Sequence, residues 1–192
     1  LSNTSPLLNS GAKLRIPGPN LDKQLIEAAR CGTPSAVKNL IAKGANPDAR
    51  GPNGITPLMI AAARGNVGIG TALIEKGADL NLPDTTEWKM APLLVASACG
   101  RFEFVELLLN KSARVTITDK ANATAWAYAT LVDNKERSSK IQKLLLSKGT
   151  PAINADSTTL FFWVADNPAF DCANSYLKNR FKGQSCSRKK AK

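Results

Sequence analysis

Three six-residue stretches decide the fold of this chain: Thr56-Pro57-Leu58-Met59-Ile60-Ala61, Ala91-Pro92-Leu93-Leu94-Val95-Ala96 and Thr124-Ala125-Trp126-Ala127-Tyr128-Ala129. They are spaced by 35 and 33 residues. A second marker recurs at 33, 35 and 37 residues, as Gly44-Ala45, Gly77-Ala78, Ser112-Ala113 and Gly149-Thr150. Because two independent markers keep one phase, the sequence predicts an array of stacked structural repeats.

Each repeat carries the signals of two short helices. Pro57 and Pro92 stand where the first turn of a helix tolerates proline. Small residues follow, which let this first helix approach its neighbours closely, and Gly65 or Gly100 then ends it. The second helix carries an apolar stripe, as in residues 102–109. One such unit cannot bury its apolar face alone, so neighbouring units must stack.

The pattern resembles the ankyrin family, whose repeat of about 33 residues carries Thr-Pro-Leu-His-x-Ala. The resemblance covers about residues 20–150, with Met59, Leu94 and Ala127 at the histidine position. It implies an all-α solenoid of helix-turn-helix units with turn fingers between them. In repeat four the extra residues 133–137 are expected to form a bulging loop between the two helices.

This resemblance divides the chain into four parts. Residues 1–19 form an extended N-terminal segment, and residues 20–150 form four repeats, of which the first is a cap with helices over 21–30 and 34–43. Residues 151–183 are expected to be a degenerate fifth repeat that caps the C-terminal end, with an unrelated tail helix as the alternative. Residues 184–192 are a basic tail.

The composition argues against catalysis. The chain has no histidine, which excludes histidine-dependent triads and zinc sites of the His-Glu-x-x-His type. The sequence also lacks a glycine-rich phosphate loop, a nucleophile elbow and a cluster of metal ligands. We therefore expect no catalytic residues, no cofactor and no metal. No apolar run approaches the roughly 18 residues that a membrane-spanning helix needs.

The four cysteines fall into two groups. Cys31 and Cys99 hold the same repeat position two repeats apart, which places them about 16–20 Å apart, too far for a disulfide. We expect both to be small apolar packing residues. Cys172 and Cys186 are predicted to form a bridge, with two free thiols as the alternative. A bridge would indicate an oxidising compartment.

Two observations bear on location and partners. The chain begins at Leu1, so we expect that an upstream segment was removed, for which a signal peptide is a candidate. With the predicted bridge, this favours an exported, periplasmic location over a cytoplasmic one. Of the formal net charge of +11, residues 178–192 contribute +7. The basic tail could bind an acidic partner or nucleic acid, although no base-reading motif accompanies it.

The resemblance implies a contact surface made of the turn tips and the inner face of the first helices. The positions it selects are Arg50, Pro52, Asn53 and Ile55 in the first turn, Arg64 on a first helix, Glu87, Trp88, Lys89 and Met90 in the second turn, and Lys120 and Asn122 in the third. Trp88 has two interpretations. It is either an exposed anchor for a partner or a side chain folded onto the adjacent finger.

We therefore predict a non-enzymatic protein-binding module that is a monomer when free. A narrower hypothesis makes it an inhibitor or self-protection protein that blocks a cell-envelope enzyme such as a peptidoglycan hydrolase. In that respect the chain is similar to a periplasmic ankyrin protein with which some predatory bacteria block their own cell-wall hydrolases. The alternative is a cytoplasmic scaffold, adaptor or effector whose basic tail binds an acidic partner or nucleic acid.

Overall fold

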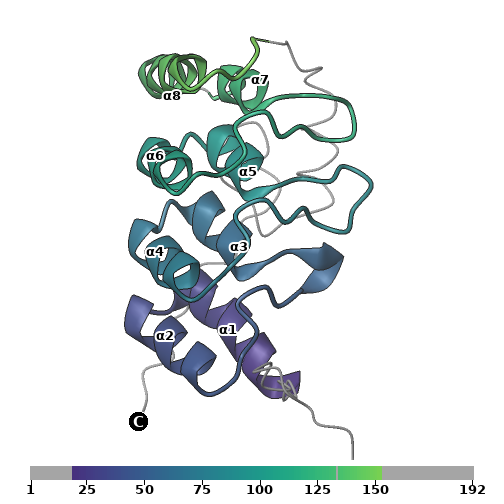
Figure 1. Cartoon of the computed structure of the whole chain (residues 1–192), viewed down its shortest axis with the longest axis vertical. Coiled ribbons are helices and arrows are strands. Elements are labelled where there is room, and N and C mark those ends of the chain that lie inside the picture. The colour runs from purple at the N-terminus through teal and green to yellow at the C-terminus, as the bar shows by residue number, and fades with distance from the viewer. Residues whose placement is uncertain (1–18, 133, 153–192) are drawn as a thin grey trace, which may run out of the picture.

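The computed structural model describes residues 19–132 and 134–152. These residues form four pairs of helices with one 3-10 turn: α1 Pro19–Cys31 and α2 Pro34–Ala42, η1 Pro52–Gly54, α3 Pro57–Arg64 and α4 Val67–Glu75, α5 Pro92–Ala98 and α6 Phe102–Asn110, α7 Ala125–Thr130 and α8 Lys135–Ser147. Figure 1 shows the first helices of the pairs in one layer, the second helices in a parallel layer, and the connecting turns projecting from the first layer. The predicted all-α solenoid is confirmed.

The repeated sequence motif acts locally, at the start of each first helix. Thr56 Oγ1 accepts a hydrogen bond from Met59 N at 3.2 Å, and Thr124 Oγ1 accepts one from Ala127 N at 3.4 Å. A threonine cap satisfies a backbone donor that the first helical turn leaves without a partner. Gly65, at φ 70°, ends α3 in the left-handed conformation, as the sequence predicts.

Each layer is continuous along the solenoid. The first helices pack in the order α1, α3, α5, α7, and the second helices pack in the order α2, α4, α6, α8. The second layer is close enough to require a glycine, because a Cβ on Gly70 of α4 would lie 2.5 Å from the Phe104 ring of α6. Leu73, Leu94 and Phe104 are fully buried between the layers. Stacking therefore supplies the core that a single pair of helices lacks.

Side-chain oxygens join each pair of helices to the next along the chain. In each case an Asp or Asn side chain accepts a hydrogen bond from a backbone N–H that lies 24, 31 or 33 residues later in the chain. The three bonds are Asn46 N to Asp22 Oδ1 at 2.7 Å, Asp79 N to Asp48 Oδ1 at 2.9 Å, and Arg114 N to Asn81 Oδ1 at 2.7 Å. These bonds fix the register of one repeat on its neighbour.

Two sequence-based expectations about the fold need correction. The helix α1 begins at Pro19 rather than at residue 21. In repeat four, α8 begins at Lys135 and has 13 residues, compared with 9 in α4 and in α6. The extra length therefore extends the second helix rather than forming a bulging loop. Asn134 Oδ1 caps the longer helix by accepting a hydrogen bond from Arg137 N at 2.9 Å.

The cysteines also differ from expectation. Cys31 ends α1 and Cys99 caps α5, and both are disulfide-bonded. The prediction that both are small apolar packing residues holds for Cys99, which packs in the hydrophobic core at 7% exposure, but not for Cys31, which is exposed. Neither is a free thiol. The predicted bridge between Cys172 and Cys186 lies outside the described residues, as do residues 1–18, the degenerate fifth repeat and the basic tail.

Within the described ranges, no helix is both long and apolar enough to cross a bilayer.

Candidate protein-binding surface

Three turns project side by side from the first-helix layer (Figure 1). We call them finger 1 (residues 50–55), finger 2 (residues 83–90) and finger 3 (residues 118–123). A backbone hydrogen bond closes each finger at its base: Gly51 N to Ile55 O at 2.9 Å, Asp84 N to Met90 O at 2.8 Å, and Asp119 N to Ala123 O at 3.2 Å. The fingers thus share one construction despite different lengths.

Each finger turns through a residue in the left-handed conformation. These residues are Asn53 at φ 58°, Lys89 at φ 55° and Asn122 at φ 61°. Asparagine tolerates this conformation better than most side chains, whereas lysine adopts it at a cost. All three side chains are exposed. The turn geometry therefore presents one polar side chain on each finger, at Asn53 three residues before the cap of α3, and at Lys89 and Asn122 two residues before the caps of α5 and α7.

Hydrogen bonds hold the three fingers in a row. Thr85 N of finger 2 donates to Asn53 O of finger 1 at 3.0 Å, and Lys120 N of finger 3 donates to Trp88 O of finger 2 at 3.0 Å. Arg50 Nη1 donates to Pro83 O at 3.1 Å and to Gly54 O within its own finger at 3.3 Å. The fingers therefore form one continuous surface, which we call the finger row.

Buried aspartates stiffen fingers 2 and 3. Asp84 is 2% exposed, and its Oδ1 accepts hydrogen bonds from Thr86 Oγ1 at 2.8 Å and from Met90 N at 3.2 Å. Asp119 is 5% exposed and accepts from Ala123 N at 2.7 Å and from the Tyr128 hydroxyl at 2.6 Å. Burial, and then the hydrogen bond to Asp119, raise the pKa of Tyr128 well above its ordinary value.

The structure separates the predicted contact residues into two groups. Ile55 is 6% exposed and Met90 is fully buried, so both support the fingers from beneath and cannot meet a partner directly. The exposed positions are Arg50, Pro52, Asn53, Arg64, Glu87, Lys89, Lys120 and Asn122. Glu87 and Lys120 also form an exposed ion pair at 3.7 Å between fingers 2 and 3. The finger row is therefore polar and charged at its tips.

Trp88 is half-buried and packs against the hydrophobic core. Its backbone N donates to Thr86 Oγ1 at 3.3 Å, and its backbone O accepts from Lys120 N in the next finger. These contacts favour the interpretation in which Trp88 folds against the neighbouring finger and stiffens the row. Its two neighbours along the chain, Glu87 and Lys89, are charged and exposed.

Several positions on the inner face of the first helices are buried. Ala63 and Ala98, which the resemblance places on that face, are both buried, and Cys99 is only 7% exposed. Every residue of α5 from Pro92 to Ala98 is buried. Arg64, the expected contact position on α3, is exposed. The finger row and Arg64 are therefore the accessible described parts of the expected surface.

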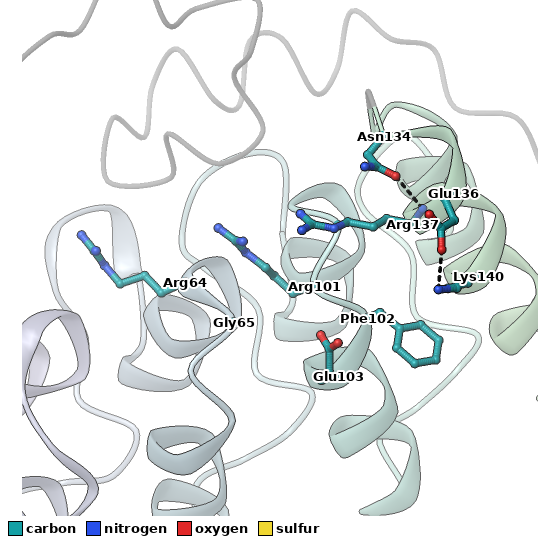
Figure 2. Close-up of a pocket in the computed structure, with 10 residues that line it drawn as sticks. Arg64, Gly65, Arg101, Phe102, Glu103, Asn134, Glu136, Arg137 and Lys140 are labelled. Atoms are coloured by element: carbon teal, nitrogen blue, oxygen red, sulfur yellow. Dashed lines mark hydrogen bonds and ion pairs between the residues drawn. The ribbon is translucent and has the colours of Figure 1, made fainter.

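A second candidate site lies at the turns between the paired helices. An open pocket of about 690 Å³ there is lined by Arg64, Gly65, Gly100, Arg101, Phe102, Glu103, Asn134, Glu136, Arg137 and Lys140. Figure 2 shows the side chains of Arg64, Arg101 and Arg137 side by side, one from each of three successive repeats. Arg101 is fixed by a hydrogen bond from its Nε to Ala63 O at 2.8 Å. We call these three side chains the arginine row.

The pocket carries excess positive charge. It combines the arginine row and Lys140 with two carboxylates, Glu103 and Glu136, and Glu136 is paired with Lys140 at 2.6 Å. Of the arginine row, only Arg64 was singled out from the sequence. The available signal was the spacing of 37 and 36 residues between the three arginines, close to the repeat length.

Known sequences now place this fold in a family. The profile described as "Ankyrin repeats (3 copies)" matches residues 25–119. Residues 25–119 are ankyrin repeats. The chain is 33% identical over 105 residues to Ankyrin repeat and KH domain-containing protein 1 of Homo sapiens, and 35% identical over 108 residues to Ankyrin repeat and KH domain-containing protein mask of Drosophila melanogaster. It is 36% identical over 95 residues to Ankyrin repeat and SAM domain-containing protein 6 of Rattus norvegicus.

These similarities cover only the repeats. The aligned residues are 55%, 56% and 50% of this chain but 4%, 3% and 10% of the respective relatives. The similarity therefore concerns the ankyrin array, and it gives no information about functions that reside in the other parts of the relatives. Ankyrin repeats bind other proteins, and the family is in general an interaction module without enzymatic activity. Within the described residues, no group of His, Cys, Asp and Glu could hold a metal ion.

Proposed function

We propose that this chain is a non-enzymatic protein-binding module that holds its partner on the finger row and blocks an enzyme of the cell envelope, such as a peptidoglycan hydrolase. The observation that carries the binding surface is the set of hydrogen bonds that fixes three exposed finger tips relative to one another. A surface that is already ordered loses little conformational freedom when a partner binds. Rigid, polar tips are thus suited to filling an opening in another protein.

The disulfide bonds of Cys31 and Cys99 support a location in the cell envelope, which this proposal requires. Structural disulfides form and persist in oxidising compartments, including the bacterial periplasm, and are rare in the cytosol. An exported chain would meet envelope enzymes there. The same observation counts against the cytoplasmic scaffold, which would work among reducing thiol pools.

The test is an inhibition assay with purified peptidoglycan hydrolases, in which clearing of a peptidoglycan suspension is followed as this chain is titrated in. We expect at least one hydrolase to lose its activity at a molar ratio near one. The triple variant Glu87→Ala/Lys89→Ala/Lys120→Ala should weaken that inhibition at least tenfold. All three side chains are exposed, so the fold should tolerate their loss.

The matched control is Lys76→Ala/Glu106→Ala/Lys143→Ala. It removes the same charges from exposed positions of the second-helix layer, away from the fingers. Equal inhibition by both triple variants would show that the finger row is not the contact surface. If a broad panel of hydrolases keeps full activity, the envelope-enzyme part of the proposal fails.

The arginine row favours a second candidate function, an adaptor that binds an acidic segment of another protein. Three arginines from successive repeats could pair with carboxylates spaced along an extended chain. The test compares binding of a fluorescent poly-glutamate peptide with binding of single-stranded DNA. We expect Arg64→Ala/Arg137→Ala to weaken peptide binding several-fold, while Lys76→Ala/Lys143→Ala leaves it unchanged. Tighter binding of DNA than of the peptide would instead favour the nucleic-acid alternative.

A further inference from the structure

The arginine row presents positive charge at one point in each of three successive repeats. Arg64 is the last residue of α3, Arg101 is the N-cap of α6, and Arg137 lies in the first turn of α8. All three line the same pocket, and Figure 2 shows their guanidinium groups in a line. Arg64 and Arg137 are exposed. A ligand that contacts the whole line must therefore be elongated and negatively charged.

The carboxylates of the pocket leave the two outer arginines unneutralised. Glu136 is paired with Lys140 on its own helix, with Nζ and Oε1 2.6 Å apart. Figure 2 shows Glu103 apart from the line of guanidinium groups. Among the described residues, neither Arg64 nor Arg137 forms an ion pair. Each of these two side chains can therefore bind a carboxylate of a ligand through two parallel hydrogen bonds.

The central arginine is fixed in place by the preceding repeat. An N-cap residue usually bonds its own helix through a short polar side chain, but Arg101 makes no such bond. Its Nε instead donates to Ala63 O of α3 at 2.8 Å. Its side chain passes close to Gly65, where a Cβ would lie 2.8 Å from Arg101 Cδ. This hydrogen bond and the missing side chain at Gly65 together hold Arg101 across the gap between two repeats.

The stacking of the repeats sets the distance between neighbouring arginines. Successive helices pack directly on one another in both layers, α3 on α5 on α7 and α4 on α6 on α8. The axes of packed helices lie about 8–10 Å apart. One step along the arginine row is therefore about 8–10 Å, and the carboxylates of a matching ligand must recur at that distance on one face.

The regular backbone conformations differ in how well they meet this condition. In a β-strand, residues on one face recur at about 6.7 Å and about 13 Å, and neither distance fits. In a polyproline II helix, every third residue lies on the same face, about 9 Å further on. In an α-helix, every seventh residue does so at about 10.5 Å. An acidic segment that does not fold by itself already populates polyproline II, which favours that conformation.

We propose that the arginine row binds an acidic segment of another protein in the polyproline II conformation, with a carboxylate at every third residue. This inference rests on the second candidate function, the adaptor, and adds the spacing and the conformation of its ligand. Each carboxylate pairs with the guanidinium group of one repeat. The two residues between successive carboxylates face away from the row, so they need no charge.

Fluorescence anisotropy with two labelled peptides of equal length and composition tests the spacing. Both peptides carry five glutamates among prolines, which keep both in the polyproline II conformation. The first has glutamate at every third position, on one face, and the second has it at every fourth position, so that its carboxylates wind around the helix. We expect the first peptide to bind several-fold more tightly although the total charge is the same. Equal affinities, or tighter binding of the second peptide, would overturn the proposal.

Two protein variants connect this preference to the arginine row. Arg64→Ala/Arg137→Ala should bind both peptides weakly and with equal affinity, because a single arginine cannot distinguish the two spacings. The control Lys76→Ala/Lys143→Ala removes the same charge from exposed positions of the second-helix layer and should keep the preference. If the arginine variant still preferred the first peptide, the contact would lie elsewhere and the proposal would be wrong.

Two further peptides separate the possible failures. An alanine-rich helical peptide with glutamate at every seventh residue should bind more weakly than the first peptide, and tighter binding would contradict the polyproline II conformation. Poly-glutamate tests the adaptor function itself. If poly-glutamate binds but the two proline-rich peptides do not differ, the adaptor function stands and the spacing fails. If none of these acidic peptides binds, the adaptor function and this inference both fail.

Discussion

A few residues carry an unusual backbone conformation, and they mark the end of each second helix. Gly44, Gly77 and Gly149 have positive φ, at 110°, 87° and 87°, and Ser112 has φ 64° at the corresponding position. At these points the chain closes the helix with backbone bonds such as Ser112 N to Leu109 O at 3.1 Å. Glycine adopts this conformation without strain, whereas a side chain with a Cβ does not. Ser112 is therefore a local weak point of the array.

The variant Ser112→Gly should raise the free energy of unfolding by about 1 kcal/mol, because it removes the left-handed strain. The melting temperature should rise by roughly 2–4 °C. The reverse change, Gly77→Ser, should lower stability by a similar amount, although a Cβ on Gly77 would meet no atom within 4 Å. Thermal unfolding measured by circular dichroism checks both. Equal melting temperatures for all three proteins would contradict the strain argument.

Ser97 is a second residue that departs from its repeat. Its hydroxyl is fully buried and has no hydrogen-bond partner among the described residues. The corresponding residue of the preceding repeat is Ala62. A buried hydroxyl without a partner costs about 1–3 kcal/mol relative to a satisfied one.

We therefore expect Ser97→Ala to stabilise the chain by about 1 kcal/mol, measured as a shift of the urea midpoint at constant slope. The control Ala62→Ser should destabilise it, because the new hydroxyl enters the tightly packed helix α3. A loss of stability in Ser97→Ala would mean that the hydroxyl does find a partner.

At the scale of elements, the fingers are held to the helices by specific side-chain contacts. Finger 3 is joined to its own helix pair by the hydrogen bond from the Tyr128 hydroxyl on α7 to Asp119 Oδ2, at 2.6 Å. Both groups are buried. A charge-assisted bond between buried groups is stronger than a bond between neutral ones. Finger 3 is thus fixed to α7 and cannot tilt independently of the solenoid.

Removing this link with Tyr128→Phe should lower the free energy of unfolding by about 1–3 kcal/mol, because Asp119 keeps its burial but loses a donor. The ring still fills the same space, so packing is not the cause. Urea unfolding measures the loss, and amide hydrogen exchange should rise in residues 118–123 more than in finger 1. Uniform exchange across the fingers would show that the link does not act locally.

Tyr128 also makes the stability of the folded chain depend on pH, and the direction of this dependence can be worked out. Burial and the bond to Asp119 raise the pKa of Tyr128 in the folded state above its ordinary value near 10. The folded state therefore holds this proton more tightly, so its stabilising effect is complete below pH about 10 and declines as pH rises above it. We expect the decline to approach 1.4 kcal/mol per pH unit and to be missing in Tyr128→Phe. Parallel curves for the two proteins above pH 10 would refute this.

At the scale of the whole molecule, stability comes from stacking, since each helix pair contacts its sequence neighbours. Such arrays unfold readily from their ends. Cys31 and Cys99 are both disulfide-bonded, and such bonds constrain the unfolded chain. A disulfide typically contributes about 2–4 kcal/mol to the free energy of unfolding.

Reduction should therefore lower the melting temperature by roughly 10–30 °C. The measurement is a thermal scan with and without a phosphine reductant, on the wild-type chain and on Cys31→Ser/Cys99→Ser. The double variant should already melt at the lower temperature and should respond little to reductant. A wild-type chain that melts at the same temperature in both conditions would show that the bonds contribute nothing to stability.

The sequence by itself determined the repeats, the helices and the positions where the helices begin and end. These features are local, because Thr56 caps and Pro57 starts the helix in which they lie. Whether a finger residue is exposed or buried could not be read from its neighbours in the sequence. Ile55 and Met90 are buried as members of the core that the stacked repeats share, although exposed residues lie next to them along the chain. The arginine row exists because stacking superimposes turns that are 37 and 36 residues apart. The bonds of Cys31 and Cys99 depend on which parts of the chain meet in space, a question that only the tertiary structure answers.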